Sequence, residues 1–287
     1  MSGFYGLKEF VESVDRGSTH YHSFRKTPAQ ITTAGIWFDM SMSAGLPLPQ
    51  YYAASPLVGQ QMKKSTDGGF NHGPSVSPAN KYLNRFLLMS NSATGLPMPW
   101  ILCDYLAYYP FVDTGVNDEQ FMTAVSLPRY TDGKGVQMMA VSVAPCSGLL
   151  PSFVVNYTNS SGVSGRTSAK MQLNSATANG SILTSTAGST ISSGPFIGLQ
   201  SGDSGVRSVE SVTFTSGTDV GLFALVLVKP LITSALIERT APSEVVPVSH
   251  QSQLPQIQDD AFLSLLTLPN GSLTGISFFG EIETVWN

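Results

Sequence analysis

The sequence has few charged residues, few cysteines and no long hydrophobic run. Only 12% of its 287 residues are charged, with 15 Lys and Arg against 19 Asp and Glu. So few charges make a helical bundle a poor choice, because exposed helix faces are built largely from Glu, Lys and Arg. Nucleic-acid binding needs a basic excess that neutralises phosphates, and the net charge here is −4. We therefore expect neither a helical bundle nor a nucleic-acid partner.

The two cysteines, Cys103 and Cys146, are too few for a disulfide framework or a zinc cluster. We expect two buried free thiols, and a single bridge between them is the alternative. The longest apolar run, residues 220–228, is far shorter than the roughly 20 residues of a membrane-spanning helix. Residues 1–17 lack the basic start and apolar stretch of a secretory signal. We expect a protein made in the cytoplasm, without a membrane partner.

Serine, threonine and glycine are abundant instead, with 38 Ser, 23 Thr and 27 Gly. Short apolar stretches recur about every ten residues, and Gly, Pro, Ser and Asn separate them, which is typical of a β-sandwich or barrel. Residues 206–215 alternate in hydropathy and residues 220–229 are mostly apolar, so they predict a hairpin whose second strand is buried. We predict a mainly β fold, an antiparallel jelly-roll-like β-sandwich with a few short inserted helices.

The first thirty residues differ from the rest of the chain. Their apolar residues recur at helical spacing and predict a short amphipathic helix that ends at Gly17. Residues 19–30 then indicate an extended arm. We interpret residues 1–30 as an N-terminal helix and arm and residues 31–287 as a single β-sandwich domain. Helical insertions are expected at about 53–92, where Tyr82, Phe86 and Met89 recur at three to four residues after Pro78.

Several motifs resemble catalytic or metal sites. Gly202-Asp203-Ser204-Gly205 matches the tetrad around the nucleophile of trypsin-like proteases, but Val206 follows it and no histidine has the required context. His20 and His22 could present two metal ligands from one strand face, and a third ligand is missing. We interpret these motifs as a turn and a solvated strand, and we expect no catalytic residue, no metal ion and no cofactor.

Two further sets of side chains leave alternatives open. Glu281 and Glu283 lie two apart in a predicted strand, roughly 7 Å from each other, and paired carboxylates can cleave glycosidic bonds. Aromatic residues could line a sugar-binding groove or fill a core, namely Tyr51, Tyr52, Tyr105, Tyr108, Tyr109 and Phe111. Residues 158–204 hold 18 Ser or Thr and only three charged residues, a composition that suits an interface as well as long loops.

Five stretches spread over nearly the whole chain carry a resemblance to a known group. They are residues 3–11 (GFYGLKEFV), 33–39 (TAGIWFD), 103–111 (CDYLAYYPF), 202–208 (GDSGVRS) and 280–286 (GEIETVW). Together they resemble tailed-bacteriophage virion proteins that are described as structural or minor capsid proteins. The resemblance implies a role in the particle, as a shell-decorating, cementing or head-to-tail component, and it carries no catalytic residue.

The resulting expectation is a non-enzymatic structural protein of a phage virion, most simply a capsid decoration or cement protein that bridges shell subunits. Its partners would be the major capsid protein or other virion subunits, with homo-oligomers in the particle and assembly in the host cytoplasm. The expected partner-binding residues are those of the N-terminal helix, namely Phe4, Tyr5, Leu7, Phe10, Val11 and Val14. The alternative is a low-copy tail, portal-proximal or vertex component that binds host glycans, and a third possibility is a depolymerase that uses Glu281 and Glu283.

Overall fold

The computed structural model describes residue 4 and residues 6–185, 194–247 and 254–287. Within these residues the chain is mainly β, and the strands of its sheets pair antiparallel. The helical elements are α1 (Leu7–Asp15), the 3-10 turn η1 (Met40–Met42) and α2 (Lys64–Asp67). The expected mainly antiparallel β fold with a few short helices is confirmed. The jelly-roll-like strand topology stays a prediction.

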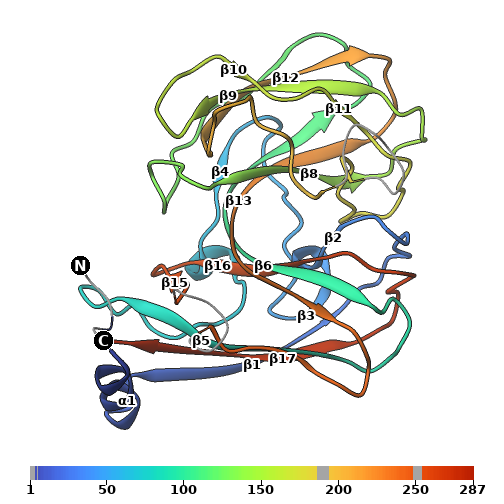
Figure 1. Ribbon diagram of the computed structural model, residues 1–287. Helices are drawn as coiled ribbons and strands as arrows, with labels where there is room; N and C mark the ends of the chain where they lie inside the picture. Colours follow the sequence, from blue (N-terminus) through green and yellow to red (C-terminus); the bar gives the residue numbers. More distant parts are fainter. Residues whose placement is uncertain (1–3, 5, 186–193, 248–253) are drawn as a thin grey trace.

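The described strands form a lower, an upper and a central sheet (Figure 1). The lower sheet has the order β14 (Ser243–Val245), β5 (Lys81–Ser90), β17 (Phe278–Trp286), β1 (Thr19–Thr27) and β3 (Ala44–Leu46), and β15 (Gln256–Ile257) also pairs with β5. The upper sheet has the order β10 (Arg166–Thr167), β9 (Ser152–Asn159), β12 (Val206–Ser216) and β7 (Gln120–Phe121), and β11 (Met171–Gln172) also pairs with β9. The central sheet has the order β2 (Phe38–Asp39), β16 (Phe262–Thr267), β6 (Met98–Asp113), β13 (Leu222–Leu236) and β8 (Gln137–Ala144), and β4 (Gln60–Gln61) also pairs with β6.

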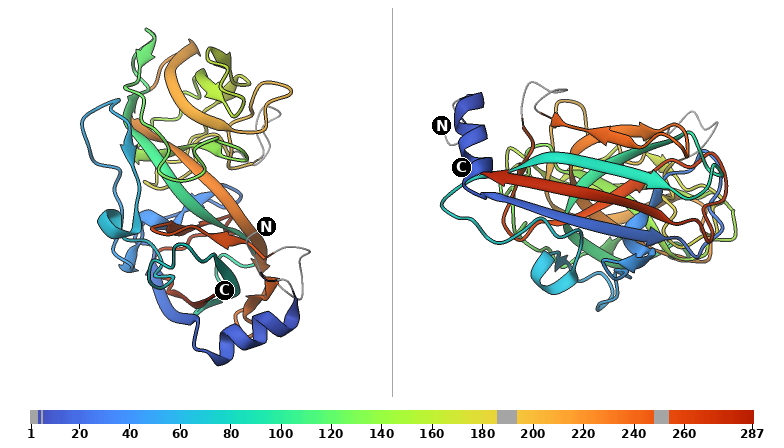
Figure 2. Two further views of the ribbon diagram at one scale, coloured as in Figure 1. Left: turned by 90° about the vertical axis from the view of Figure 1, so that its left-hand side faces the viewer. Right: turned by 90° about the horizontal axis from the view of Figure 1, so that it is seen from below.

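The central sheet belongs to both halves of the molecule. Its strands β6 and β13, with 16 and 15 residues, pass from the upper half into the lower half (Figures 1 and 2). One face of β6 supplies Trp100 and Leu102 to the core between the central and lower sheets, and Leu106 to the core between the central and upper sheets. Cys103 and Tyr105 point to the opposite face and a third core. The fold is therefore two sandwiches that share the long strands β6 and β13.

The two cores are separated by polar residues where β6 and β13 pass between the halves. Asp104 of β6 is the register partner of Lys229 of β13, and the pairing of these strands shifts register on both sides of Lys229. Asp104 lies between Leu102 of one core and Leu106 of the other. Because a buried charge must be paired, this position needs a partner from outside the sheet.

Of the helical insertions predicted at about 53–92, the described residues contain only the four-residue α2. Residues 81–90 form strand β5, and within 53–64 the regular element is the short strand β4, with α2 following at Lys64–Asp67. The pairing of β5 with β17 shifts register between Arg85 and Leu83, which leaves Asn84 as the extra residue of a β-bulge. The bulge turns Leu83 and Phe86 to the same core although they are three residues apart. This spacing imitates that of a helix.

Residues 19–27 are extended, as predicted, but they form strand β1 inside a sheet of this chain and not a separate arm. The strand pairs with β17 from Thr19 to Lys26 on one edge and with β3 from Arg25 to Thr27 on the other. The division predicted at residue 30 therefore does not separate β1 from the sandwich. The N-terminal helix is confirmed as α1, which lies at one end of the lower sheet (Figure 2).

The predicted hairpin of residues 206–229 is wrong as well. β12 pairs with β9 and β7 in the upper sheet, whereas β13 pairs with β6 and β8 in the central sheet. Both strands contribute to one core, through Phe214 and Phe223, so the connection folds one layer over the other. Cys103 and Cys146 are free and buried, as expected. Neither described α-helix has the length and hydropathy to cross a membrane.

Candidate functional site

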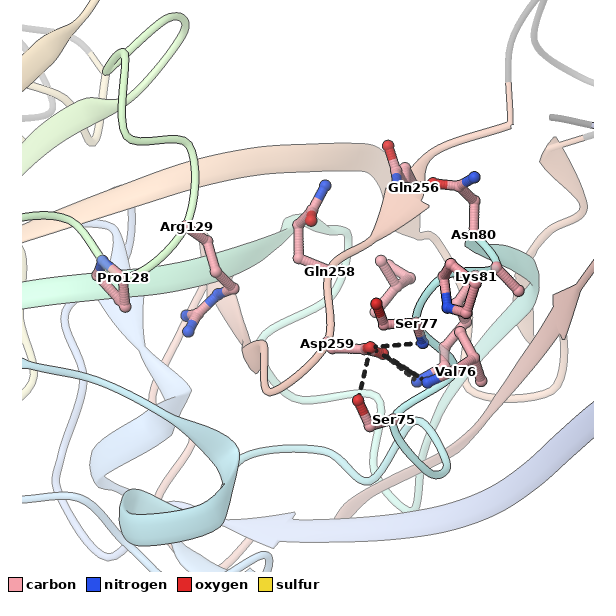
Figure 3. A pocket seen from close by; sticks show the side chains of 13 residues that line it. Ser75, Val76, Ser77, Asn80, Lys81, Pro128, Arg129, Gln256, Gln258 and Asp259 are labelled. Carbon is pink, nitrogen blue, oxygen red and sulfur yellow. Dashed lines mark hydrogen bonds and ion pairs between the residues drawn. The ribbon is translucent and has the colours of Figure 1, made fainter. Parts of the chain in front are cut away.

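A polar cleft lies between the two halves of the molecule. Its volume is about 530 Å³, and three segments line it: residues 75–81 from the loop before β5, residues 128–129 from the upper half, and residues 256–259 before β16 (Figure 3). This size falls within the range of small-molecule sites, about 300–1,000 Å³. Gln256 also lines an adjoining hollow of about 380 Å³ together with Tyr82, Tyr130 and Pro230.

Arg129 forms the upper wall of the cleft and is held by the buried acid of β6. Its Nε donates to Oδ2 of Asp104 at 2.9 Å and its Nη2 donates to Oδ1 at 2.7 Å. Nη2 also donates to the backbone oxygens of Met62 and Tyr105. Burial raises the pKa of Asp104 to about 6, and Arg129 opposes this shift. The guanidinium charge is thus neutralised within the protein, while Nη1 makes no hydrogen bond to a described residue.

Asp259 holds the opposite wall in place. It accepts hydrogen bonds from the Ser75 hydroxyl at 2.6 Å and from the backbone N–H groups of Val76 and Ser77, each at 3.1 Å (Figure 3). Burial alone would raise the pKa of Asp259, but these hydrogen bonds together with Lys81 lower it. The ionised carboxylate therefore acts as the anchor of the 75–81 segment.

Lys81 and His72 lie beneath that segment, and both have hydrogen-bond partners within the protein. The Lys81 amine donates to Nδ1 of His72 at 3.2 Å and to the backbone oxygen of Pro74, and it lies 3.5 Å from Asp259. His72 Nε2 lies 3.0 Å from the backbone oxygen of Ala261, so the ring is a neutral donor at Nε2. Burial, with Lys81 nearby, lowers the pKa of His72 to about 3. Burial also lowers the pKa of Lys81, and both groups support the cleft wall.

The groups left for a ligand are mostly uncharged. Neither the Gln258 side-chain amide nor the Ser77 hydroxyl hydrogen-bonds to any described residue, and Asn80 uses only its Oδ1, which accepts from Gln256. Gln258 stands between Arg129 on one side and the Asn80–Gln256 pair on the other (Figure 3). The cleft thus presents neutral amides and a hydroxyl.

The protease-like tetrad is a turn, as interpreted from the sequence. The Asp203 carboxylate accepts hydrogen bonds from Arg166 at 3.0 Å, Tyr157 at 2.6 Å and Asn159 at 2.7 Å, which lower its pKa to about 2. The Ser204 hydroxyl lies 3.0 Å from that of Ser160. The described histidines lie in the other half of the molecule, and His250 is outside the described residues. Asp203 therefore pins the turn before β12.

The paired histidines and the paired glutamates do not form sites with other groups. The rings of His20 and His22 on β1 stack at 6.5 Å, and among described residues no three His, Cys, Asp or Glu side chains come together as metal ligands. Glu281 pairs with Arg85 on the outer face of the lower sheet at 3.3 Å. Glu281 and Glu283 lie on the outer face of β17 because side chains alternate between the two faces of a strand.

The tyrosine set does not line a groove. Tyr52, Tyr105 and Tyr109 are fully buried and Tyr108 is nearly so, while Tyr51 alone is largely exposed. The hydroxyls of Tyr52 and Tyr105 bind the buried carboxylate of Asp39 at 2.5 and 2.7 Å. The alternative of a sugar-binding groove formed by this set is therefore wrong, because its four buried tyrosines belong to the core while Tyr51 is exposed and Phe111 is half-buried.

The expected partner-binding residues of the N-terminal helix divide into two groups. Phe4 packs against Phe10 and against Tyr82 of β5, with ring centroids 5.4 and 5.5 Å apart, so these rings face their own sheet. Leu7, Val11 and Val14 point to solvent and are exposed by 69%, 46% and 39%. Tyr5 lies outside the described residues.

The cleft was not predicted from the sequence. Its lining residues carry no motif, and residues 75–81 fell within the helical insertions predicted at about 53–92. Comparison with protein-family models, curated proteins and solved structures gives no match for this chain.

Proposed function

We propose that this chain is a non-enzymatic structural protein of a bacteriophage virion that binds shell subunits in many copies. The resemblance of its five sequence stretches to phage virion proteins supports this role. The structural observation that carries the proposal is the exposed apolar stripe of α1, made of Leu7, Val11 and Val14. A stripe at this spacing suits docking into a groove of another subunit.

The stripe lies beside a second surface that suits assembly. The outer face of β5, β17 and β1 is uncovered when the molecule is seen from below, with α1 at its end (Figure 2). Tyr21 and Phe279 on this face are 56% and 36% exposed, and Arg85 forms ion pairs with Glu244 at 2.6 Å and with Glu281 at 3.3 Å. Aromatic side chains and arginine are enriched at protein interfaces.

The mechanism is mechanical. A contact of standard size, about 1,600 Å², between a rigid sandwich and its neighbours holds a particle when it is repeated over the shell. Phe4 packs against Phe10 of α1 and Tyr82 of β5, and so holds α1 on the lower sheet. A force on the apolar stripe of α1 is therefore transmitted to the lower sheet.

The first test is the copy number of this chain in purified virions, measured by quantitative mass spectrometry against the major shell protein. A shell-wide cement protein is present in hundreds of copies. About a dozen copies would move the protein to a vertex, the portal or the tail, and absence from the particles would refute a virion role.

The second test is particle binding by a variant of the stripe. Leu7→Ser, Val11→Ser and Val14→Ser together should weaken co-sedimentation with particles at least about tenfold, because each lost apolar contact is worth about 1.5–3 kcal/mol when fully buried. The matched control changes three apolar residues of the upper half that are also exposed, Leu149, Val163 and Val220, to Ser. Equal binding by the two triple variants would contradict the role of α1.

A further inference from the structure

The cleft between the two halves has the features of a binding site for an uncharged polyhydroxyl ligand. Its charged residues have partners within the chain: Asp104 pairs with Arg129, and Asp259 lies 3.5 Å from Lys81. A charged ligand would meet no unpaired opposite charge there. The residues that remain free to bind are amides and a hydroxyl, and these groups favour a neutral polar partner.

The free groups match the hydrogen-bonding character of sugar hydroxyls. A primary amide carries an acceptor oxygen and a donor nitrogen side by side, and each sugar hydroxyl is likewise both donor and acceptor. Gln258 offers a complete amide at the centre of the cleft, and Asn80 offers its Nδ2 because its Oδ1 already accepts from Gln256 at 2.7 Å. Arg129 closes the facing side of the cleft, with its guanidinium turned toward Asp104 (Figure 3).

The adjoining hollow supplies the apolar contact that a sugar ring also needs. Tyr130, Pro230 and Leu231 line it, and it continues from the cleft at Gln256. The Lys229 amine lies 5.6 Å from the centre of the Tyr130 ring, which fixes the ring at the edge of the hollow. Amphipathic tyrosine rings suit ligands with one apolar face and polar edges.

From this arrangement we infer that the cleft binds a neutral oligosaccharide. Gln258 and Asn80 contact the hydroxyls of one sugar unit, and the hollow beside Tyr130 holds the next sugar unit. The walls are pre-formed, because Asp259 fixes the 75–81 segment and Asp104 fixes Arg129. Pre-formed walls lower the entropic cost of binding. This site is independent of the proposed shell contact, which uses α1 and the outer face of the lower sheet.

The test is a titration of the full chain with maltohexaose, cellohexaose and chitohexaose. Binding is measured by calorimetry and by the NMR signals of the side-chain amides. We expect at least one of the three to bind, with shifts of the Gln258 and Asn80 amide signals. Gln258→Ala and Asn80→Ala should each weaken that binding about five- to tenfold, the usual effect of one lost hydrogen bond. Gln30→Ala is the matched control, since Gln30 is exposed and lies outside the cleft lining.

Three results would overturn the inference. The first is that none of the three hexasaccharides binds. The second is that Gln258→Ala binds as tightly as Gln30→Ala. The third is that peptides from denatured casein bind in a Gln258-dependent manner while the sugars do not, which would make the cleft a peptide site. Because Gln258 is a partly exposed side chain without a hydrogen bond to a described residue, its variant should keep the wild-type circular dichroism spectrum.

Discussion

Arg129 reaches Asp104 from 25 residues further along the chain and binds both of its carboxylate oxygens, at 2.7 and 2.9 Å, inside the protein. The side chains of this pair are 6% and 0% exposed. It fills the polar position between the upper and lower cores, so it ties the 128–130 segment to the middle of β6. The pair therefore fixes the Arg129 wall of the cleft to β6.

Removal of Arg129 should destabilise the protein strongly. Arg129→Met leaves the Asp104 carboxylate buried without a partner, which costs about 3–5 kcal/mol in comparable buried pairs. The loss should shrink as the pH falls from 8 to 5, because a proton then neutralises Asp104, whose pKa is already raised to about 6 in the intact pair. Urea unfolding of both proteins at pH 8 and pH 5 measures this change.

The double variant Arg129→Met with Asp104→Leu serves as the control for that experiment. It removes both charges, so most of the lost stability should return. A double variant no more stable than Arg129→Met would show that hydrogen bonds from Arg129 to the backbone of Met62 and Tyr105, and not the charge pair, hold this region.

His72 should make the protein sensitive to acid. Its pKa is about 3 in the folded state, and a histidine in the unfolded chain titrates near 6.5. Since the unfolded state binds the proton first, the stability contributed by neutral His72 is complete above pH 6.5 and falls as the pH drops toward 3. Between pH 7 and pH 5 the wild type should lose about 2 kcal/mol through this group.

The comparison for His72 is the variant His72→Gln, with urea midpoints measured at pH 7 and pH 5. Its stability should change less over this interval than that of the wild type, because glutamine does not titrate. His20 and His22 are present in both proteins, so their contribution cancels. Parallel pH profiles of the two proteins would refute the assignment.

Lys26 should make stability rise with pH as well, but in the alkaline range. Its amine is buried and donates to the backbone oxygens of Ser43 and Pro47 at 2.9 and 2.8 Å. Burial lowers its pKa to about 8, so above pH 8 the unfolded state keeps the proton longer than the folded state. The stability of the wild type relative to Lys26→Met should therefore rise by about 1.4 kcal/mol per pH unit from pH 8 to about pH 9.5.

Guanidinium titrations at pH 7, 8 and 9.5 test the effect of Lys26. Lys8→Met is the control, since Lys8 is exposed on α1 and pairs with Glu12 at the surface. If the difference between wild type and Lys26→Met stays flat above pH 8, the Lys26 amine is not desolvated.

Gly280 should tolerate no side chain. It lies opposite Leu88 in the β5–β17 pair, where an added Cβ would overlap the Leu87 carbonyl oxygen and the Phe24 ring. Gly280→Ala must displace one strand of the lower sheet and should cost about 1–3 kcal/mol or more. Gly6→Ala meets nothing within 4 Å and is the control, so a thermal melt in which both variants shift equally would contradict the argument.

The features predicted correctly from the sequence are those that depend on local periodicity. The spacing of Leu7, Val11 and Val14 placed α1, and the apolar run of residues 220–228 placed the buried centre of β13. Periodicity gave the wrong element for residues 81–90 because of the bulge at Asn84. One extra residue in a strand makes its buried side chains recur at the spacing expected of a helix. A bulge is fixed by the partner strand, which the local sequence does not specify.

The cleft was beyond prediction for a different reason. Its walls come from residues 75–81, 128–129 and 256–259, and only the sheet topology brings these segments together. β5 carries the first segment, β15 the last, and the two strands pair only in the folded lower sheet. Neutral side chains such as Gln258 and Asn80 also give no signal in a sequence, because amides occur on every surface.

The position of β1 determines how the molecule responds to force. α1 leads into β1 at Thr19, which is paired with Val285 at the end of β17, and the ladder runs from there to Lys26. A force on α1 along the axis of β1 acts in shear on all the hydrogen bonds between β1 and β17, so these bonds must break together. A pull directed away from the sheet opens them one at a time, starting at Thr19. An attachment through α1 is thus strong in one direction and easily peeled in the other.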